Sequence, residues 1–141
     1  MSGVTQNVGQ MLKSMVNVRR FDRVLEKVTL VSHAPGRVVC EMKVEEEHAN
    51  VGGTLHGGLT ATIVDDISTL ALLCTERGVA GVSANLDITY MSPAKIGEDV
   101  VITAYVLRQG KTLAFASVDL TNKATGKLIA QGRHIKYLGS G

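Results

Sequence analysis

Two adjacent carboxylates lie within the most apolar stretch of the chain. Asp65 and Asp66 occur in the run "HGGLTATIVDDISTLALLC", residues 56–74. A carboxylate that leaves water without a partner costs a large free energy, so such an acid either reaches solvent or has a use. A carboxylate in partly apolar surroundings is a candidate general base. The alternative for Asp65 is a hydrogen-bonded interface acid without chemistry.

A glycine-rich loop precedes these acids. In "GGTLHGG", residues 52–58, Gly57 and Gly58 begin the apolar run. The first N–H groups of a helix have no intrahelical acceptor, and the helix dipole adds positive potential there. A backbone without side chains lets another molecule approach, so an anion or a developing oxyanion would be stabilised at this point. The alternative is a tight turn with close helix packing. The loop lacks the Lys-Ser/Thr of a P-loop and the dinucleotide fingerprint.

Other chemistries find little support in the sequence. The four histidines, His33, His48, His56 and His134, show no metal-ligand spacing, and no H-E-x-x-H motif occurs. We therefore predict no metal site and a structural or orienting role for His56. No G-x-S-x-G elbow supplies a nucleophilic serine.

The acids must be positioned by a helix over residues 57–77, ended by Gly78 as a C-cap. At 100° per residue one apolar stripe forms; it contains Leu59, Ile63, Ile67, Leu70 and Cys74. Asp65 lies nearly opposite this stripe, on a face of small and apolar residues, and we expect a second subunit to cover that face. Asp66 lies on the shoulder of the stripe, directed toward the sheet.

Strands surround this helix in the sequence. Alternation of apolar and polar residues predicts strands over 27–33, 37–45, 82–90, 98–108, 112–121 and 127–137. "RQGK" (108–111) and "NKATGK" (122–127) are predicted hairpin turns, each with a glycine able to adopt a positive φ. One very apolar helix needs a sheet around it, so we predict a single α+β domain over residues 1–141, with a curved antiparallel sheet.

Composition limits the classes of function. The chain has 141 residues and a net charge of +2, too weak for a nucleic-acid surface. No segment predicts a membrane span, and two apolar-flanked cysteines, Cys40 and Cys74, are typical of buried thiols in a reducing compartment. Residues 1–21 predict an amphipathic helix docked on the domain that stays attached and does not control turnover directly; a mitochondrial transit peptide is the alternative. We expect a cytoplasmic protein, with a mitochondrial location as a second possibility.

At these residues the chain resembles a known family. The pattern N-x5-HGG-x6-D, here Asn50, His56-Gly57-Gly58 and Asp65, is similar to the hotdog-fold thioesterases of the phenylacetate-pathway type. The stretches "VEEEH", "GTLHGGLTAT", "ITYMSPAK" and "LTNKATGKLIAQGRH" extend the resemblance to the acyl-coenzyme A thioesterases over nearly the whole chain. It implies a hotdog sheet around one helix, assembled as a tetramer from two dimers, with acyl-coenzyme A as the substrate.

The resemblance also implies roles for individual residues. Asp65 would be the general base or nucleophile, and the Gly57 N–H the oxyanion donor. Asn50 and Ser83 would position the thioester and the water, and His56 would shape the loop. Asp66 departs from the family pattern, in which a neutral residue is common.

Coenzyme A would bind at a subunit interface against "YMSPAK" and "RQGKTL", where the cations Lys95, Arg108 and Lys111 suit its phosphates. The full predicted coenzyme A surface consists of Ser83, Asn85, Tyr90, Met91, Ser92, Pro93, Ala94, Lys95, Arg108, Gln109, Gly110, Lys111, Thr112, Leu113 and Tyr137.

The predicted activity is hydrolysis of medium- to long-chain fatty acyl-coenzyme A, without a cofactor, since coenzyme A belongs to the substrate. The family resemblance also implies a lipid-transfer protein as a partner. Two alternatives stay open: a non-catalytic acyl-coenzyme A or lipid carrier on the same fold, and a hotdog dehydratase that acts on a 3-hydroxyacyl thioester.

Overall fold

The protein is described by a computed structural model that covers residues 8–139. Two helices, two short 3₁₀ turns and six strands follow one another in the order α2 (Val8–Val16), η1 (Phe21–Leu25), β1 (Thr29–Ala34), β2 (Arg37–Lys43), η2 (Glu46–His48), α3 (Gly57–Leu73), β3 (Val82–Tyr90), β4 (Asp99–Gln109), β5 (Leu113–Asn122) and β6 (Leu128–Tyr137). Each predicted strand and the central helix is present, with ends that shift by a few residues.

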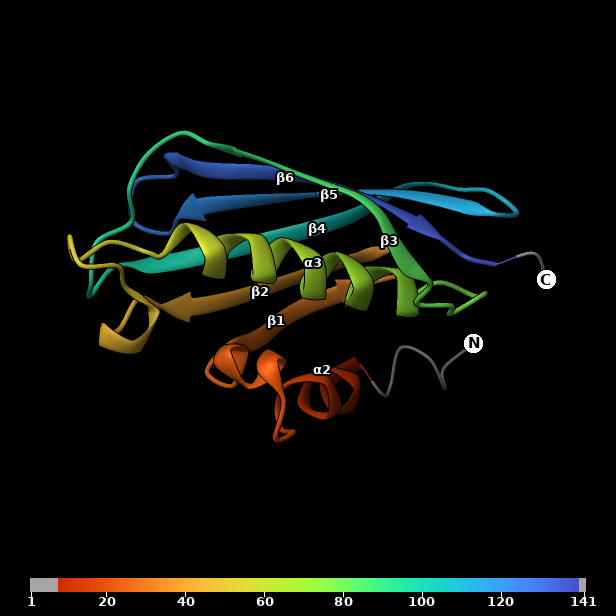
Figure 1. Cartoon of the computed structure of the whole chain (residues 1–141), viewed down its shortest axis with the longest axis horizontal. Coiled ribbons are helices and arrows are strands. Elements are labelled where there is room, and N and C mark those ends of the chain that lie inside the picture. The colour runs from red at the N-terminus through yellow and green to blue at the C-terminus, as the bar shows by residue number, and fades with distance from the viewer. Residues whose placement is uncertain (1–7, 140–141) are drawn as a thin grey trace.

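The six strands form one antiparallel sheet in the order β1-β2-β4-β5-β6-β3, which curves around α3 (Figure 1). Side chains of β4 alternate between buried and partly exposed positions, as the sequence alternation predicts. The strand that follows α3 in the sequence, β3, crosses over to pair with β6, and therefore forms one edge of the sheet. The expected α+β class with a curved sheet around one helix is confirmed.

The predicted apolar stripe of α3 is buried against this sheet. Ile63, Ile67 and Leu70 have no exposed surface. The helix also approaches β6 unusually closely, because a Cβ on Gly132 would collide with the side chain of Val64. The burial of each large aliphatic side chain stabilises the fold by about 2 kcal/mol, so this helix is the centre of the core.

The central helix ends earlier than predicted, at Leu73 instead of residue 77. The hydroxyl group of Thr75 donates a hydrogen bond to the Leu72 carbonyl at 2.7 Å and accepts one from the Gly78 N–H at 3.2 Å. Such side-chain bonds to the backbone compete with helical ones, and they close a turn here. Gly78 has the expected positive φ of 60°, but in this turn and not directly after the helix.

The N-terminal segment packs beside α3 and the sheet edge at β1 (Figure 1). Within α2 the buried residues are Val8, Leu12 and Val16, which confirms a docked amphipathic helix over the part that the structure describes. Its expected continuation over residues 17–21 gives way to the 3₁₀ turn η1. Residues 1–7 of the prediction lie outside the described residues.

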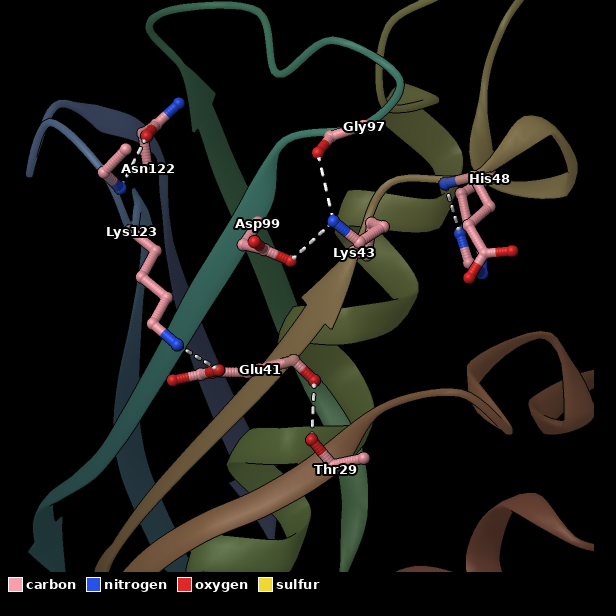
Figure 2. A network of polar contacts seen from close by, with 10 residues as sticks. Thr29, Glu41, Lys43, His48, Gly97, Asp99, Asn122 and Lys123 are labelled. Carbon is pink, nitrogen blue, oxygen red and sulfur yellow. Dashed lines mark hydrogen bonds and ion pairs between the residues drawn. The ribbon is translucent and has the colours of Figure 1, made fainter.

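Polar contacts on the outer side of the sheet connect β2 to its neighbours (Figure 2). Lys43 lies 3.5 Å from Asp99 on β4, and Lys123, in the β5–β6 turn, lies 3.0 Å from Glu41 on β2. Exposed pairs of this kind contribute little free energy, so they mark the register more than they stabilise it.

The two predicted hairpin turns are present, but only one contains a glycine with a positive φ. Gly126 in the β5–β6 turn has a positive φ of 75°, as predicted, whereas Gly110 in the β4–β5 turn does not. The latter turn closes through a Gly110 N–H bond to the Leu113 carbonyl, which needs no left-handed residue. Cys40 and Cys74 are buried, and burial raises their pKa values to about 12 and about 11.

Candidate active site

His56 is the N-cap of α3. Its Nδ1 accepts a hydrogen bond from the Gly58 N–H at 2.9 Å, so the ring satisfies one of the free donors of the first turn. A Cβ on Gly58 would lie only 3.1 Å from that ring, which explains why glycine suits the position. Among the described residues no acceptor takes the Gly57 N–H. The Gly57 N–H is therefore an unused donor in a positive potential at the start of the helix.

The segment after β3 lies beside this helix start. The Tyr90 hydroxyl donates to the Gly57 carbonyl at 2.7 Å, and its ring lies within 3.6 Å of where a Gly57 Cβ would be. The Leu55 N–H bonds the carbonyl of Ala94, whose side chain is buried. Lys95, which forms a β-bridge with Thr54, is exposed. Residues 90–95 thus border the free Gly57 N–H.

Asn50 lies in the same loop, but its carboxamide is used within it. The Oδ1 atom accepts from the N–H groups of Gly52 and Thr54 at 3.0 and 3.1 Å, and Nδ2 contacts the Thr54 hydroxyl at 3.0 Å. These bonds make Asn50 the residue that shapes the loop. A direct contact with a thioester would require the carboxamide to exchange one of them.

The Asp65 carboxylate lies two turns along α3, with 43% of its side chain exposed. Its nearest titratable neighbour is His134 on β6, at 3.8 Å from Oδ1 to Nε2. The His134 ring is fully buried and contacts two hydroxyl groups, Ser68 at 2.8 Å and Ser83 at 2.7 Å. A half-exposed carboxylate and the Ser83 hydroxyl therefore meet over one buried imidazole.

Asp66 was predicted to point toward the sheet, but it points toward the N-terminal segment instead. Asp66 is buried, and its carboxyl group interacts with that of Asp22 in η1. Burial, followed by the interaction with Asp22 and the charge of Asp65, raises the pKa of Asp66 to about 8, against a smaller opposing effect of Lys136. Asp66 Oδ2 has no hydrogen-bond partner among the described residues, so a charge on this carboxyl group would be poorly compensated.

The small-residue face of α3 is also covered differently from the prediction. Ser68 is buried under His134, and Leu72 packs with Ala114 and Leu138 of the same chain. Gly58 is exposed, and Asp65 is partly so, on this face. Only the N-terminal half of this face therefore stays open in one chain.

Sequence reasoning missed two residues of β6. Lys136 is buried, donates to the Thr69 hydroxyl at 2.9 Å, and is close enough to Asp65 and Asp66 for both to affect its pKa. Burial lowers the pKa of Lys136, while the two acids raise it. The signal was present in strand parity: His134 and Lys136 share a face with Gly132, which packs on α3.

The β4–β5 turn lies at the opposite end of the sheet from Tyr90. Tyr137 pairs with both Leu113 and Val82, whereas Tyr90 pairs with Ala130. Arg77 fixes the turn through a 2.8 Å bond to the Gly110 carbonyl. The predicted coenzyme A surface is thus split within one chain, with residues 90–95 at one end and 108–113 at the other.

The candidate site therefore consists of two groups. The first half-site comprises Asn50, His56, Gly57 and residues 90–95; the second comprises Asp65, Ser83, His134, residues 108–113 and Tyr137. Gly57 and Asp65 are eight residues apart on one helix, which is about 12 Å at 1.5 Å per residue. No single reacting group reaches both.

Two further properties bear on the class of site. Over residues 8–139, no three His, Cys, Asp or Glu side chains are grouped as metal ligands. None of the helices in that range is long and apolar enough to cross a membrane.

Sequence comparison identifies related proteins. Residues 52–129 match the family model of the thioesterase superfamily. Acyl-coenzyme A thioesterase 13 of Homo sapiens is 71% identical over 140 residues, which cover 99% of this chain and 100% of the relative.

Solved structures agree with this comparison. Zebrafish thioesterase superfamily member 2 superposes with a TM-score of 0.93 at 65% identity, over 96% of this chain and 98% of that one. A hypothetical thioesterase protein from Streptococcus pneumoniae, solved with coenzyme A, gives a TM-score of 0.78 at 26% identity, over 83% and 89% of the two chains. The sheet and helix of this chain therefore have the hotdog arrangement.

Proposed function

The chain belongs to the thioesterase superfamily, and from that membership we propose that it hydrolyses medium- to long-chain fatty acyl-coenzyme A to a fatty acid and coenzyme A. The observation that carries this proposal is the pair of groups on α3: an unused Gly57 N–H at its start and the half-exposed Asp65 carboxylate beside Ser83. The 71% identical human relative bears the name of an acyl-coenzyme A thioesterase.

These two groups supply the two contributions that thioester hydrolysis needs. Asp65 takes a proton from water, whose oxygen bonds the carbonyl carbon, and the Gly57 N–H stabilises the oxyanion that forms. The intermediate then collapses, the carbon–sulfur bond breaks, and the thiolate takes up a proton. A thioester carbonyl is more electrophilic than an amide, so no nucleophilic triad and no cofactor are required. An Asp65 that attacks the carbonyl carbon itself is the alternative within the same site.

The active site is completed by a second copy of the chain. One chain holds the Gly57 N–H and Asp65 at positions about 12 Å apart along the α3 axis. The N–H must lie about 3 Å from the carbonyl oxygen and the carboxylate about 3 Å from a water that touches the carbonyl carbon, so the two groups of one chain do not fit one thioester. The edge strand β3 is exposed along its length, including Val82 at one end and Tyr90 at the other. Two copies paired antiparallel through β3 bring the Tyr90 end of one to the Val82 end of the other. The first half-site of one chain then faces the second half-site of its partner.

The same pairing reunites the coenzyme A surface. Residues 90–95 of one copy, with the exposed cation Lys95, approach residues 108–113 of the other, with Arg108 and Lys111. Three cations suit the phosphates of coenzyme A. Two such dimers form the proposed tetramer, and the family resemblance adds a lipid-transfer protein as a candidate partner.

Thiol release from a panel of acyl-coenzyme A lengths tests the activity and defines the chain-length preference. A non-catalytic carrier would bind these thioesters without releasing thiol. A dehydratase would convert a 3-hydroxyacyl thioester into an enoyl thioester. The dehydratase alternative has little structural support, because it would need a catalytic histidine. His56 is the helix cap, and His134 is enclosed between two serines.

A further inference from the structure

His134 is the one fully buried titratable side chain among the described residues of the second half-site. It projects from β6 between α3 and β3, and each ring nitrogen contacts a serine hydroxyl group. Nδ1 lies 2.8 Å from Ser68 Oγ, and Nε2 lies 2.7 Å from Ser83 Oγ. The direction of the protons in this chain decides what Ser83 presents to a substrate.

The direction follows from Ser68. Its hydroxyl group donates to the Asp65 carbonyl at 3.1 Å, and a serine has only one proton to donate. The Asp65 carbonyl oxygen can only accept, so with the Ser68 proton directed to it, Ser68 Oγ accepts from His134, which places a proton on Nδ1. Burial, with a smaller effect of Lys136, lowers the pKa of His134 to about 4 against an opposing effect of Asp65, so the ring is neutral near pH 7. Nε2 then carries a lone pair and accepts the proton of Ser83.

We propose that His134 is a positioning residue, held as the neutral Nδ1–H tautomer by Ser68, that fixes Ser83 as a hydrogen-bond acceptor toward the active site. With its own proton committed to Nε2, Ser83 Oγ offers only lone pairs to the site. A water between Asp65 and Ser83 donates one proton to each, and its lone pair is left for the carbonyl carbon.

The tautomer also keeps the carboxylate free. Asp65 Oδ1 is 3.8 Å from His134 Nε2, too far for a hydrogen bond, and an unprotonated Nε2 has nothing to donate. In the other tautomer an Nε2–H group would face both Ser83 and the carboxylate, and it would compete with water for Asp65. The role in turnover rests on the proposed function, whereas the neutral tautomer rests on the hydrogen bonds and the burial of the ring.

The tautomer is measured directly by NMR on the full chain with ¹⁵N-labelled histidine. We expect His134 to show a protonated Nδ1 and an unprotonated Nε2 at pH 7, with no titration between pH 5.5 and 8. Ser68→Ala removes the acceptor of Nδ1, and the spectrum should then show a mixture of tautomers. A wild-type ring that is protonated on Nε2, or on both nitrogens, would overturn the proposal.

Kinetics test the consequence for turnover. His134→Gln can still accept a proton from Ser83, whereas His134→Leu cannot, so kcat should fall by up to about a hundredfold in His134→Leu and much less in His134→Gln, with KM nearly unchanged. Ser68→Ala, a smaller change, should also lower kcat without altering KM. Equal kcat values in wild type and Ser68→Ala, combined with a changed tautomer, would refute the positioning role.

The two proposals fail in different ways. A wild-type protein that releases no thiol from any acyl-coenzyme A contradicts the proposed function and with it the role of His134 in turnover, while the NMR result still decides the tautomer. An active wild type with the wrong tautomer contradicts the His134 inference alone.

Discussion

Asp65 and Asp66 are consecutive on α3, but their carboxyl groups contact different parts of the chain. Asp65 faces His134 of β6, with 43% of its side chain exposed. Asp66 is buried against Asp22 of η1, with the proton that its raised pKa of about 8 retains at neutral pH. One step of 100° along a helix separates these environments. The pair therefore offers matched substitutions that remove different functions.

Asp65→Asn should lower kcat for acyl-coenzyme A hydrolysis by about a hundred- to ten-thousandfold, because it removes the general base while keeping the side-chain volume. Asp66→Asn should retain most of the activity, since Asp66 faces away from the site. Thiol-release kinetics measure both, and circular dichroism verifies the fold. Comparable losses in the two variants would show that the catalytic carboxylate is wrongly assigned.

Gly57→Pro tests the oxyanion donor. Proline suits the first position of a helix and lacks only the N–H group, and a Cβ at Gly57 meets the Tyr90 ring at an ordinary 3.5 Å. We expect kcat to fall by about a hundred- to a thousandfold. Gly57→Ala is the matched control, because it adds the same Cβ but keeps the N–H. If alanine is as harmful as proline, the defect is steric and the N–H has no catalytic role.

Complementation tests whether two chains share each site. Asp65→Asn and Gly57→Pro chains, co-expressed with different tags in equal amounts, should recover about a quarter of the wild-type activity, since half of the dimers are hybrid and each hybrid has one intact site. Light scattering should give about 60 kDa, four times the 15.0 kDa chain. A mixture no more active than its components, or a 15.0 kDa particle, would exclude the shared site.

The Asp66–Asp22 contact predicts a pH dependence of stability. The pKa of Asp66 is about 8 in the folded chain against an ordinary value of 3.8, so the folded state binds a proton that the unfolded state loses in this interval. The free energy of unfolding that depends on Asp66 is therefore fully present below pH 4 and is lost as pH rises toward 8.

Denaturant titrations of wild type and Asp66→Asn at several pH values measure this effect. The stability of wild type relative to the variant should fall from pH 4 to pH 8. His134, whose folded pKa is lowered to about 4, makes both proteins more stable from pH 4 to about 6.5, and this contribution cancels in the difference. Asp22→Asn should reduce the slope. A pH-independent difference would mean that Asp66 is ionised in the fold.

Leu12→Ala tests the role of α2. This side chain is 4% exposed, so its truncation should cost about 2 kcal/mol or more of unfolding free energy. We expect kcat/KM to stay unchanged well below the melting temperature, because α2 contributes no residue to either half-site. The exposed Gln10 allows a control, Gln10→Ala, with little effect on stability. A large loss of kcat/KM in Leu12→Ala, without unfolding, would assign the segment a direct part in turnover.

The spacing of apolar residues in the sequence was sufficient to predict the fold. Alternation located the six strands, and the apolar stripe identified which face of the central helix is buried. The end of that helix was not predictable from the stripe, because Thr75 ends it through hydrogen bonds of its own side chain. A side chain that competes for backbone hydrogen bonds does not change the spacing of apolar residues, so the helix end could not be found from that spacing.

The site was only half accessible to sequence reasoning. The Gly57 and Asp65 positions follow from the motif, but the direction of Asp66 depends on where η1 packs, which is a tertiary contact. His134 was judged only as a metal ligand. Its partners, Ser68 and Ser83, are 66 and 51 residues away in the sequence, and only strand pairing brings them together.

The contact between Gly132 and Val64 sets a limit for protein engineering. There is no room for even one methyl group at Gly132. The distance between α3 and β6 therefore depends on this glycine, which lies two residues before His134. An added carbon at Gly132 would push α3 away from β6 at Val64, and so increase the distance between Asp65 on α3 and Ser83 without contacting either residue. Redesign of the protein should therefore leave Gly132 unchanged and alter positions where a change in volume is not transmitted to Asp65 and Ser83.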